Sequence, residues 1–257
     1  MNRLPDILDV ANTAVIILPH IHSFDKMWYF TNHGESHCVS VLKNVEEIIK
    51  ICDLSGMPLN EAEKSILRCA SWLHDLGRIR EEEGSDHALE SVKVIRILCK
   101  NGHLNLGMIN DEVEHVIATH STKGLLRLEH IEKDRPISGF QESVRLKLLC
   151  ALFKIADECD IDRLRAPKPV YDILIDKMPS TSKSHWLRHN NVIKVVFSYP
   201  ERTIIIHMLK GCDDEDILES LDKTLNNDII KRILIEYKFP LTDYRIQFHA
   251  NVDISEE

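Results

Sequence analysis

The chain has 257 residues, of which 44% are hydrophobic and 28% charged, and its formal net charge is −9. This length allows one helical domain with a sizeable core and a small appendage. No apolar run approaches the roughly 20 residues that span a bilayer. The apolar run at 14–18 is shorter than a signal-peptide core of about 7–15 residues. We therefore expect a cytoplasmic protein without membrane contact.

The charge and the side-chain inventory narrow the kinds of chemistry further. An acidic chain repels a phosphate backbone unless it carries a local basic stripe, so the charge disfavours a nucleic-acid partner without excluding one. The seven cysteines stand singly and form no CxxC pair, which predicts reduced, buried thiols rather than a thiolate zinc site. Fourteen histidines are a high number and are the first indication of metal chemistry.

From about residue 34 to 164, apolar residues at three- and four-residue spacing predict a series of helices. The expected helices cover 36–52, 60–76, 85–98, 111–120 and 142–159. Asn60 with Glu63, and Asp111 with Glu114, have the spacing of a capping box, and Ser85 is the expected cap of the third helix.

After Pro167 and Pro169 the pattern changes. β-Branched residues at 192–198 and 203–208, separated by a turn at 199–202, predict a hairpin. Residues 213–237 are expected to form one or two helices, and 244–254 a third strand. The predicted fold is mainly α, with a helical domain at 1–170 and a small α/β appendage at 171–257 built on an antiparallel sheet.

The central motif is Leu73-His74-Asp75-Leu76-Gly77, which we expect at the end of the second helix, with Gly77 as the residue that ends it. Adjacent helical residues point about 100° apart, but one metal ion can bind both side chains from over the last turn. Taken alone the dipeptide is weak evidence, because a solvated helix end is the usual explanation for such a pair.

Further histidines and a carboxylate stand one to a helix. His37 precedes the motif, His87 opens the next helix, His120 ends the one after, and Asp157 lies on the last long helix. A helical bundle can bring ligands from facing helices to one interior point. The order of these residues therefore favours a metal site over a chance array.

These strings resemble the HD superfamily of metal phosphohydrolases, which includes nucleotidases, deoxynucleotide triphosphohydrolases, cyclic-nucleotide phosphodiesterases and HD nucleases. The resemblance covers roughly residues 30–165. Its specific parts are the HGxxH opening from His33 to His37, the HDLG element, and Ala156-Asp157-Glu158-Cys159-Asp160-Ile161-Asp162. The opening and the β-rich tail also resemble an HD subgroup found with GHKL-type ATPases in bacterial conflict systems.

The resemblance implies an HD-type helical bundle and a ligand set. His37, His74, Asp75 and Asp157 match the four core metal ligands, and His87 and His120 match the histidines that hold a second ion in some members. Asp75 would then bridge the ions. The cofactor is expected to be one or two divalent ions of manganese, iron, zinc, nickel or magnesium. Such an ion lowers the pKa of water from about 15.7 to about 7 and supplies a hydroxide for phosphoester cleavage.

Several cations are candidates for stabilising the charge on a reacting phosphate. Arg78 follows the HDLG element where some members have lysine. An arginine keeps the positive charge but is a poorer proton donor, which leaves a general-acid role in doubt. Lys123 and Arg163 are further candidates, and a solvated surface cation is an equal alternative for each. His33 fits either a partner of the ligands or a helix-entry cap. The remaining histidines, His185 and His189 among them, match no pattern, and Trp186 is expected to pack in the appendage.

The function that this pattern favours is hydrolysis of a phosphoester in a nucleotide or similar small phosphorylated substrate. One alternative is an HD nuclease acting on single-stranded nucleic acid. Another is a non-catalytic regulatory module that binds a nucleotide or a protein partner, with the C-terminal domain as the docking surface.

Overall fold

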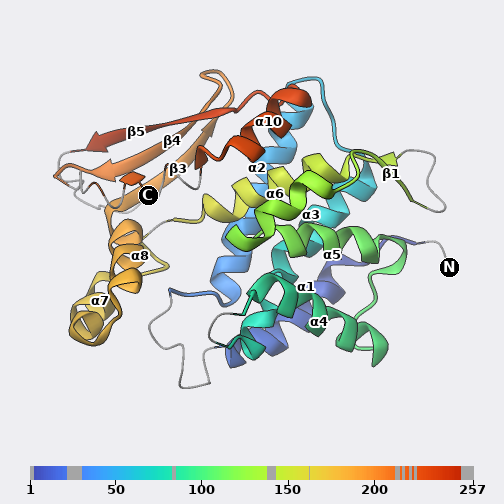
Figure 1. Cartoon of the computed structure of the whole chain (residues 1–257), viewed down its shortest axis with the longest axis horizontal. Helices are drawn as coiled ribbons and strands as arrows, with labels where there is room; N and C mark the ends of the chain where they lie inside the picture. The colour runs from blue at the N-terminus through green and yellow to red at the C-terminus, as the bar shows by residue number, and fades with distance from the viewer. Residues whose placement is uncertain are drawn as a thin grey trace.

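The structure is a computed structural model that describes residues 3–21, 31–82, 85–137, 143–161, 163–211, 215, 218–219, 222 and 225–249. The fold is mainly α, with a small α/β part towards the C-terminus, as the sequence predicts. In Figure 1 the helices of the N-terminal part pack together on one side, while a three-stranded sheet and helices α7 and α8 lie on the other. None of the described helices is long and apolar enough to cross a membrane.

The N-terminal part is a bundle around one apolar core. Its helices are α1 (Ile7–Ile17), α2 (Glu35–Leu54), α3 (Glu61–Leu73), α4 (His87–Lys100), α5 (Asn110–Thr119) and α6 (Leu146–Glu158). Helix α6 packs against α2, α3 and α5, and its residues 148–153 are almost completely buried. Its alanines, leucines and Phe153 make this central position possible, because a helix that is apolar on all sides is stable only when surrounded.

Short 3₁₀ helices and a small ribbon connect these elements. The 3₁₀ segments are η1 (Leu18–His20), η2 (Leu76–Arg80), η3 (Gly107–Ile109), η4 (Thr122–His130) and η5 (Ile175–Lys177), and the ribbon pairs β1 (Arg135–Pro136) with β2 (Ser143–Val144). The six described cysteines are free thiols, five of them buried, and Cys212 lies outside the described residues.

The helix starts follow local chemistry only in part. The Asn60–Glu63 capping box is present, with each side chain accepting a hydrogen bond from the other residue's backbone N–H. The cap of α4 is Asp86 rather than the expected Ser85. Asp111 caps nothing, because α5 begins at Asn110 directly after η3, and the preceding backbone turn replaces a side-chain cap.

Gly77 does not end a helix in the way we expected. Helix α3 stops at Leu73, and Gly77 lies inside η2. A Cβ at Gly77 would lie 2.0 Å from the backbone nitrogen of Ser91, so only glycine lets α4 approach so closely. The Gly77 N–H also donates to the Ser91 hydroxyl over 2.8 Å. This contact fixes the start of α4, and with it His87, beside the His74-Asp75 turn.

The C-terminal part contains α7 (Lys168–Leu174), α8 (Ser180–Asn191), β3 (Val192–Ser198), β4 (Thr203–Leu209), α10 (Asp228–Glu236) and β5 (Asp243–His249). The predicted hairpin is confirmed, since β3 and β4 pair antiparallel. The expectation of an all-antiparallel sheet is wrong, because β5 pairs with β4 in parallel. A parallel pair needs a crossover connection, and α10 is part of it. Some residues of the helices and the strand expected at 213–237 and 244–254 lie outside the described residues.

The sheet and α10 pack onto the bundle. Ile206, Met208, Ile230 and Ile233 belong to the same core cluster as the bundle interior. A separate small cluster contains Ala166, Tyr171, Met178 and Trp186, and it joins α7 to α8. The domain boundary at residue 170 stays a prediction.

Candidate metal centre

Four side chains from three helices meet at one buried point. His37 lies in the first turn of α2, His74 and Asp75 follow the last residue of α3, and Asp157 lies in the last turn of α6. The Nε2 atoms of His37 and His74 are 2.9 Å apart, and the Oδ1 atom of Asp157 is 3.3 and 3.5 Å from them. Oδ2 of Asp75 lies 3.6 Å from each of these nitrogens.

These spacings fit a metal ion. Donor atoms held at about 2.0–2.2 Å from one ion lie roughly 3.0–3.5 Å from one another when their directions are octahedral or tetrahedral. The observed separations of 2.9–3.6 Å span that range. Three overlapping groups have donors close enough for an ion, namely His37/His74/Asp157, His74/Asp75/His120 and His33/His37/Asp75.

The partners of the other ring nitrogens fix the chemistry of this cluster. Nδ1 of His37 is 2.5 Å from the Asp160 carboxylate, and Nδ1 of His74 is 3.2 Å from the Ser71 carbonyl oxygen. Carbonyl and carboxylate oxygens accept hydrogen bonds, so both Nδ1 atoms carry a proton. The two Nε2 atoms face each other and are the ring atoms left to bind a cation placed between them.

A second pair of histidines lies on the opposite side of Asp75. The Nε2 atoms of His87 and His120 are 3.0 Å apart, and each is 3.7 Å from Oδ1 of Asp75. Nδ1 of His120 donates to the Ile117 carbonyl over 2.6 Å, which again leaves Nε2 as the lone-pair nitrogen. The two oxygens of Asp75 therefore face different histidine pairs, the arrangement expected of a bridging carboxylate.

Electrostatics favour the metal-binding forms of Asp75 and His87. Burial would raise the pKa of Asp75, but Arg78, and then His74, outweigh burial and hold that pKa well below its usual range. The Arg78 Nε lies 3.0 Å from the Asp75 carboxylate. Burial lowers the pKa of His87 well below its usual value, and Arg78 and His120 add to this shift. His87 is therefore a neutral imidazole at neutral pH, the form that can bind a metal ion.

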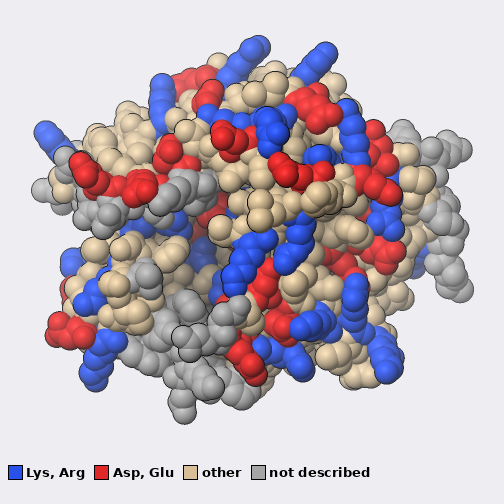
Figure 2. Space-filling view, in the orientation of Figure 1, with Lys and Arg blue, Asp and Glu red and all other residues tan. Residues whose placement is uncertain are grey.

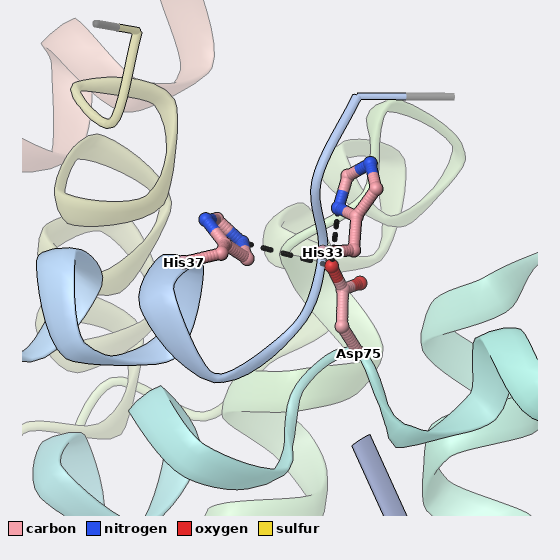
Figure 3. Close-up of side chains that lie close together, drawn as sticks. All are labelled: His33, His37 and Asp75. Atoms are coloured by element: carbon pink, nitrogen blue, oxygen red, sulfur yellow. Dashed lines mark hydrogen bonds and ion pairs between the residues drawn. The ribbon is translucent and has the colours of Figure 1, made fainter. Parts of the chain in front are cut away.

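His33 contacts the same carboxylate from a third direction. Figure 3 shows His33 and His37 both directed at Asp75, His33 from the segment that leads into α2. The Nδ1 of His33 lies 2.7 Å from Oδ2 of Asp75, and the Arg165 guanidinium lies 3.1 Å from the same nitrogen. Of the two roles left open by the sequence, this geometry favours the ligand partner, because the N-cap of α2 is Gly34.

The cluster opens onto a cavity of about 380 Å³. One wall carries Asp75, His87, His120 and Asp157 together with Arg78. The cavity also contains three cations that sequence reasoning missed, Lys154, Arg165 and Arg188, and the α8 residues Ser182, His185, Trp186 and His189. The one available signal was the spacing of His185, Arg188 and His189 along one helix, in a segment to which we assigned no structure.

Two of the predicted cations lie elsewhere. Lys123 is exposed, its ammonium group donates to the Ser85 carbonyl, and it is not among the residues that line the cavity. Arg163 is half-buried and also lies outside the lining. Any part that Lys123 or Arg163 plays in phosphate binding stays a prediction. Asp162 lies outside the described residues.

The helical bundle and its buried His/Asp cluster define an HD-type domain that could hold a metal ion. The HD-CE family model matches residues 27–234, which is most of the chain, and the chain belongs to this family. The match continues well beyond the metal cluster and includes α8 and the β3–β4 hairpin. No curated protein matches the chain.

Proposed function

We propose that this protein is a divalent-metal-dependent phosphohydrolase that cleaves a phosphoester of a nucleotide or a similar small substrate. The observation that carries the proposal is the pair of facing imidazole Nε2 atoms on each side of Asp75, beside a cavity whose lining includes Arg78, Lys154, Arg165 and Arg188. Neutral imidazoles and carboxylates suit a divalent cation, and the cations of the cavity suit a phosphate.

The roles of the ligands follow from their positions. His37, His74, Asp75 and Asp157 would hold a first ion, and Asp75 with His87 and His120 a second. A divalent ion at this site lowers the pKa of a coordinated water to about 7 and offsets charge on a phosphoryl oxygen. The mixed nitrogen and oxygen donors are compatible with manganese, iron, zinc, nickel or magnesium.

Arg78 has a double role in this proposal. Its guanidinium group contacts both Asp75 and Glu81, at 3.0 Å each, and so fixes the bridging carboxylate. Arg78 also lines the cavity, where its charge can stabilise an oxyanion. Burial would lower the pKa of Arg78, but Asp75 and then Glu81 outweigh burial and raise that pKa, so Arg78 supplies charge rather than a proton.

A small substrate suits the cavity better than a nucleic acid does. Ligand pockets commonly measure about 300–1,000 Å³, and this one measures about 380 Å³. On the face seen in Figure 2, basic and acidic side chains alternate among the described residues and form no broad basic area. A nuclease would need a basic channel beside the site.

The test combines element analysis with a substrate panel. Purified protein is assayed for bound metal and then, with added Mn²⁺, for turnover of nucleoside monophosphates, triphosphates and cyclic nucleotides. We expect bound metal and hydrolysis of at least one class, followed by separation of the nucleotide products, and loss of both metal and hydrolysis in His74→Ala. The exposed His20→Ala is the matched control and should behave as wild type.

Three outcomes would overturn the proposal. Absence of bound metal together with no turnover on the panel removes both the metal centre and the reaction. Bound metal with turnover confined to single-stranded oligonucleotides favours the nuclease. The third outcome is metal binding without any turnover, together with a metal-free variant that keeps its cellular role. The chain is then a regulatory module, whose C-terminal part is the candidate docking surface and an associated ATPase the candidate partner.

A further inference from the structure

Helix α8 contributes a row of polar side chains to the cavity that the metal centre does not use. Ser182, His185 and His189 follow one another at spacings of three and four residues, and Arg188 stands beside the last of them. Residues at this spacing share one face of a helix. Ser182, Arg188 and His189 are buried, and His185, between them in the row, is exposed.

The deepest member of this row, His189, indicates a missing polar partner. His189 is 1% exposed, and its Nδ1 makes no hydrogen bond with any described residue. Buried polar atoms are rarely left in this state, and a ligand group is one common explanation. Arg188, at 6% exposure, places a guanidinium in the same buried wall. Burial lowers its pKa, the Glu158 carboxylate opposes this shift, and the Arg165 guanidinium adds to it.

The charge of the lining indicates what such a ligand carries. Among the described residues the lining has four carboxylates and four arginine or lysine side chains, so with neutral histidines it has no formal net charge. Arg78 and Lys154 are each ion-paired with a lining carboxylate. Each divalent cation bound by Asp75 and Asp157 adds two positive charges. The loaded cavity is thus positive and has cations at two separate places, the metal centre and α8.

We propose that α8 forms a second anion subsite, and that the substrate carries two or more phosphoryl groups, as a nucleoside diphosphate or triphosphate does. The inference rests on the proposed function for the phosphoryl group at the metal centre. Arg188 would bind a distal phosphoryl group through two parallel N–H donors, with Ser182 and His189 as further donors. The subsite thereby selects polyphosphates over monophosphates.

The experiment compares two probes of matched chemistry, inorganic orthophosphate and the non-hydrolysable imidodiphosphate. Binding is measured calorimetrically at one fixed concentration of free Mn²⁺ for wild type, Arg188→Gln and Arg96→Gln. The Arg96 side chain is 67% exposed and lies outside the cavity lining, so Arg96→Gln is the control. We expect Arg188→Gln to weaken imidodiphosphate binding about tenfold to a hundredfold, to change orthophosphate binding by less than about threefold, and Arg96→Gln to change neither.

The effect of Arg188→Gln on imidodiphosphate binding, relative to its effect on orthophosphate binding, decides whether α8 forms a second anion subsite. Chelation of Mn²⁺ by a probe does not affect this comparison, because it is the same for every variant. Equal losses for both probes, or no loss for imidodiphosphate, would overturn the subsite. If Arg188→Gln does not fold by circular dichroism, Arg188→Lys and Ser182→Ala replace it, with the same selective loss expected. Failure of the proposed function is distinguishable, since the wild type then hydrolyses no nucleotide of the panel, whereas failure of the subsite leaves an active, metal-loaded enzyme in which Arg188→Gln affects both probes equally or neither.

Discussion

Substitution of Asp160 tests whether metal binding depends on the residues that hydrogen-bond to the metal ligands. The Asp160 carboxylate is 4% exposed and lies 2.5 Å from Nδ1 of His37, where it fixes the ring with its Nε2 lone pair directed at His74. In Asp160→Ala the His37 ring loses its orientation, and water can take the place of the carboxylate. Removing such a partner weakens metal affinity about 10–100-fold, or roughly 1.4–2.7 kcal/mol.

The assay is competition for Mn²⁺ or Zn²⁺ against a fluorescent chelator. Asp160→Asn keeps an oxygen that can accept from His37, so its affinity should fall between wild type and Asp160→Ala. Asp172→Ala removes an exposed carboxylate of α7 that pairs with Lys168, and it should bind metal as wild type does. A folded Asp160→Ala protein with affinity within about twofold of wild type would refute the view that this carboxylate fixes the ligand.

Three further outcomes follow from burial and close packing. Gly77→Ala should lower the free energy of unfolding, measured in urea, by at least about 3 kcal/mol, because the new Cβ would clash with the α4 backbone. The same displacement of α4 should prevent metal binding. Glu63→Ala should lose about 1–3 kcal/mol by the same measurement, because it removes the buried acceptor of the half-buried Arg145 guanidinium, which lies 2.6 Å from Glu63. Burial lowers the pKa of His189 well below its usual value, so as pH falls the unfolded chain takes up a proton at this residue before the folded protein does. The stability of the metal-free protein therefore falls as pH drops below about 6.5. This group contributes at most about 1.4 kcal/mol of that loss per pH unit. A pH series of melts should show a shallower fall for His189→Gln and an unchanged one for the exposed His20→Gln.

Patterns that act over one or two helical turns predicted much of the fold. The capping box at Asn60 and Glu63 depends on residues three positions apart, and the β-branched runs on either side of Tyr199 predict the hairpin by themselves. The alternation of short motifs with helices also placed His74 and Asp157 in different helices. The structure brings the donor atoms of these two residues within 3.5 Å.

Long-range packing decided the features that the sequence did not predict. The role of Gly77 arises from the approach of α4, and Asp86, which caps that helix in place of Ser85, also accepts hydrogen bonds from the distant Ser121 and Arg127. Which cations face the cavity is likewise a tertiary property. Lys123 stands next to the histidine motif in sequence and outside the cavity in space, whereas Arg188 is far from every motif and lines the wall. No local pattern distinguishes these two side chains.

In the proposed two-ion arrangement, the division of Asp75 between two histidine pairs predicts that the two ions bind with different affinities. The first site has two carboxylates, Asp75 and Asp157, whereas the second has only Asp75, and the Arg78 guanidinium lies 3.0 Å from the oxygen that faces it. A cation beside that oxygen weakens the binding of another, so we expect the second ion to bind at least about tenfold more weakly.

His120→Ala should therefore retain one tightly bound ion and lose the second, while His74→Ala should lose the tightly bound ion, because His74 would be a ligand of the first ion. Element analysis after dialysis against low and then millimolar Mn²⁺ counts the ions in each variant. Saturation of the wild type at one ion, with weaker orthophosphate binding in His120→Ala, would instead assign the second histidine pair to the phosphate. Loss of all metal in His120→Ala would contradict the division of Asp75 between two ion sites.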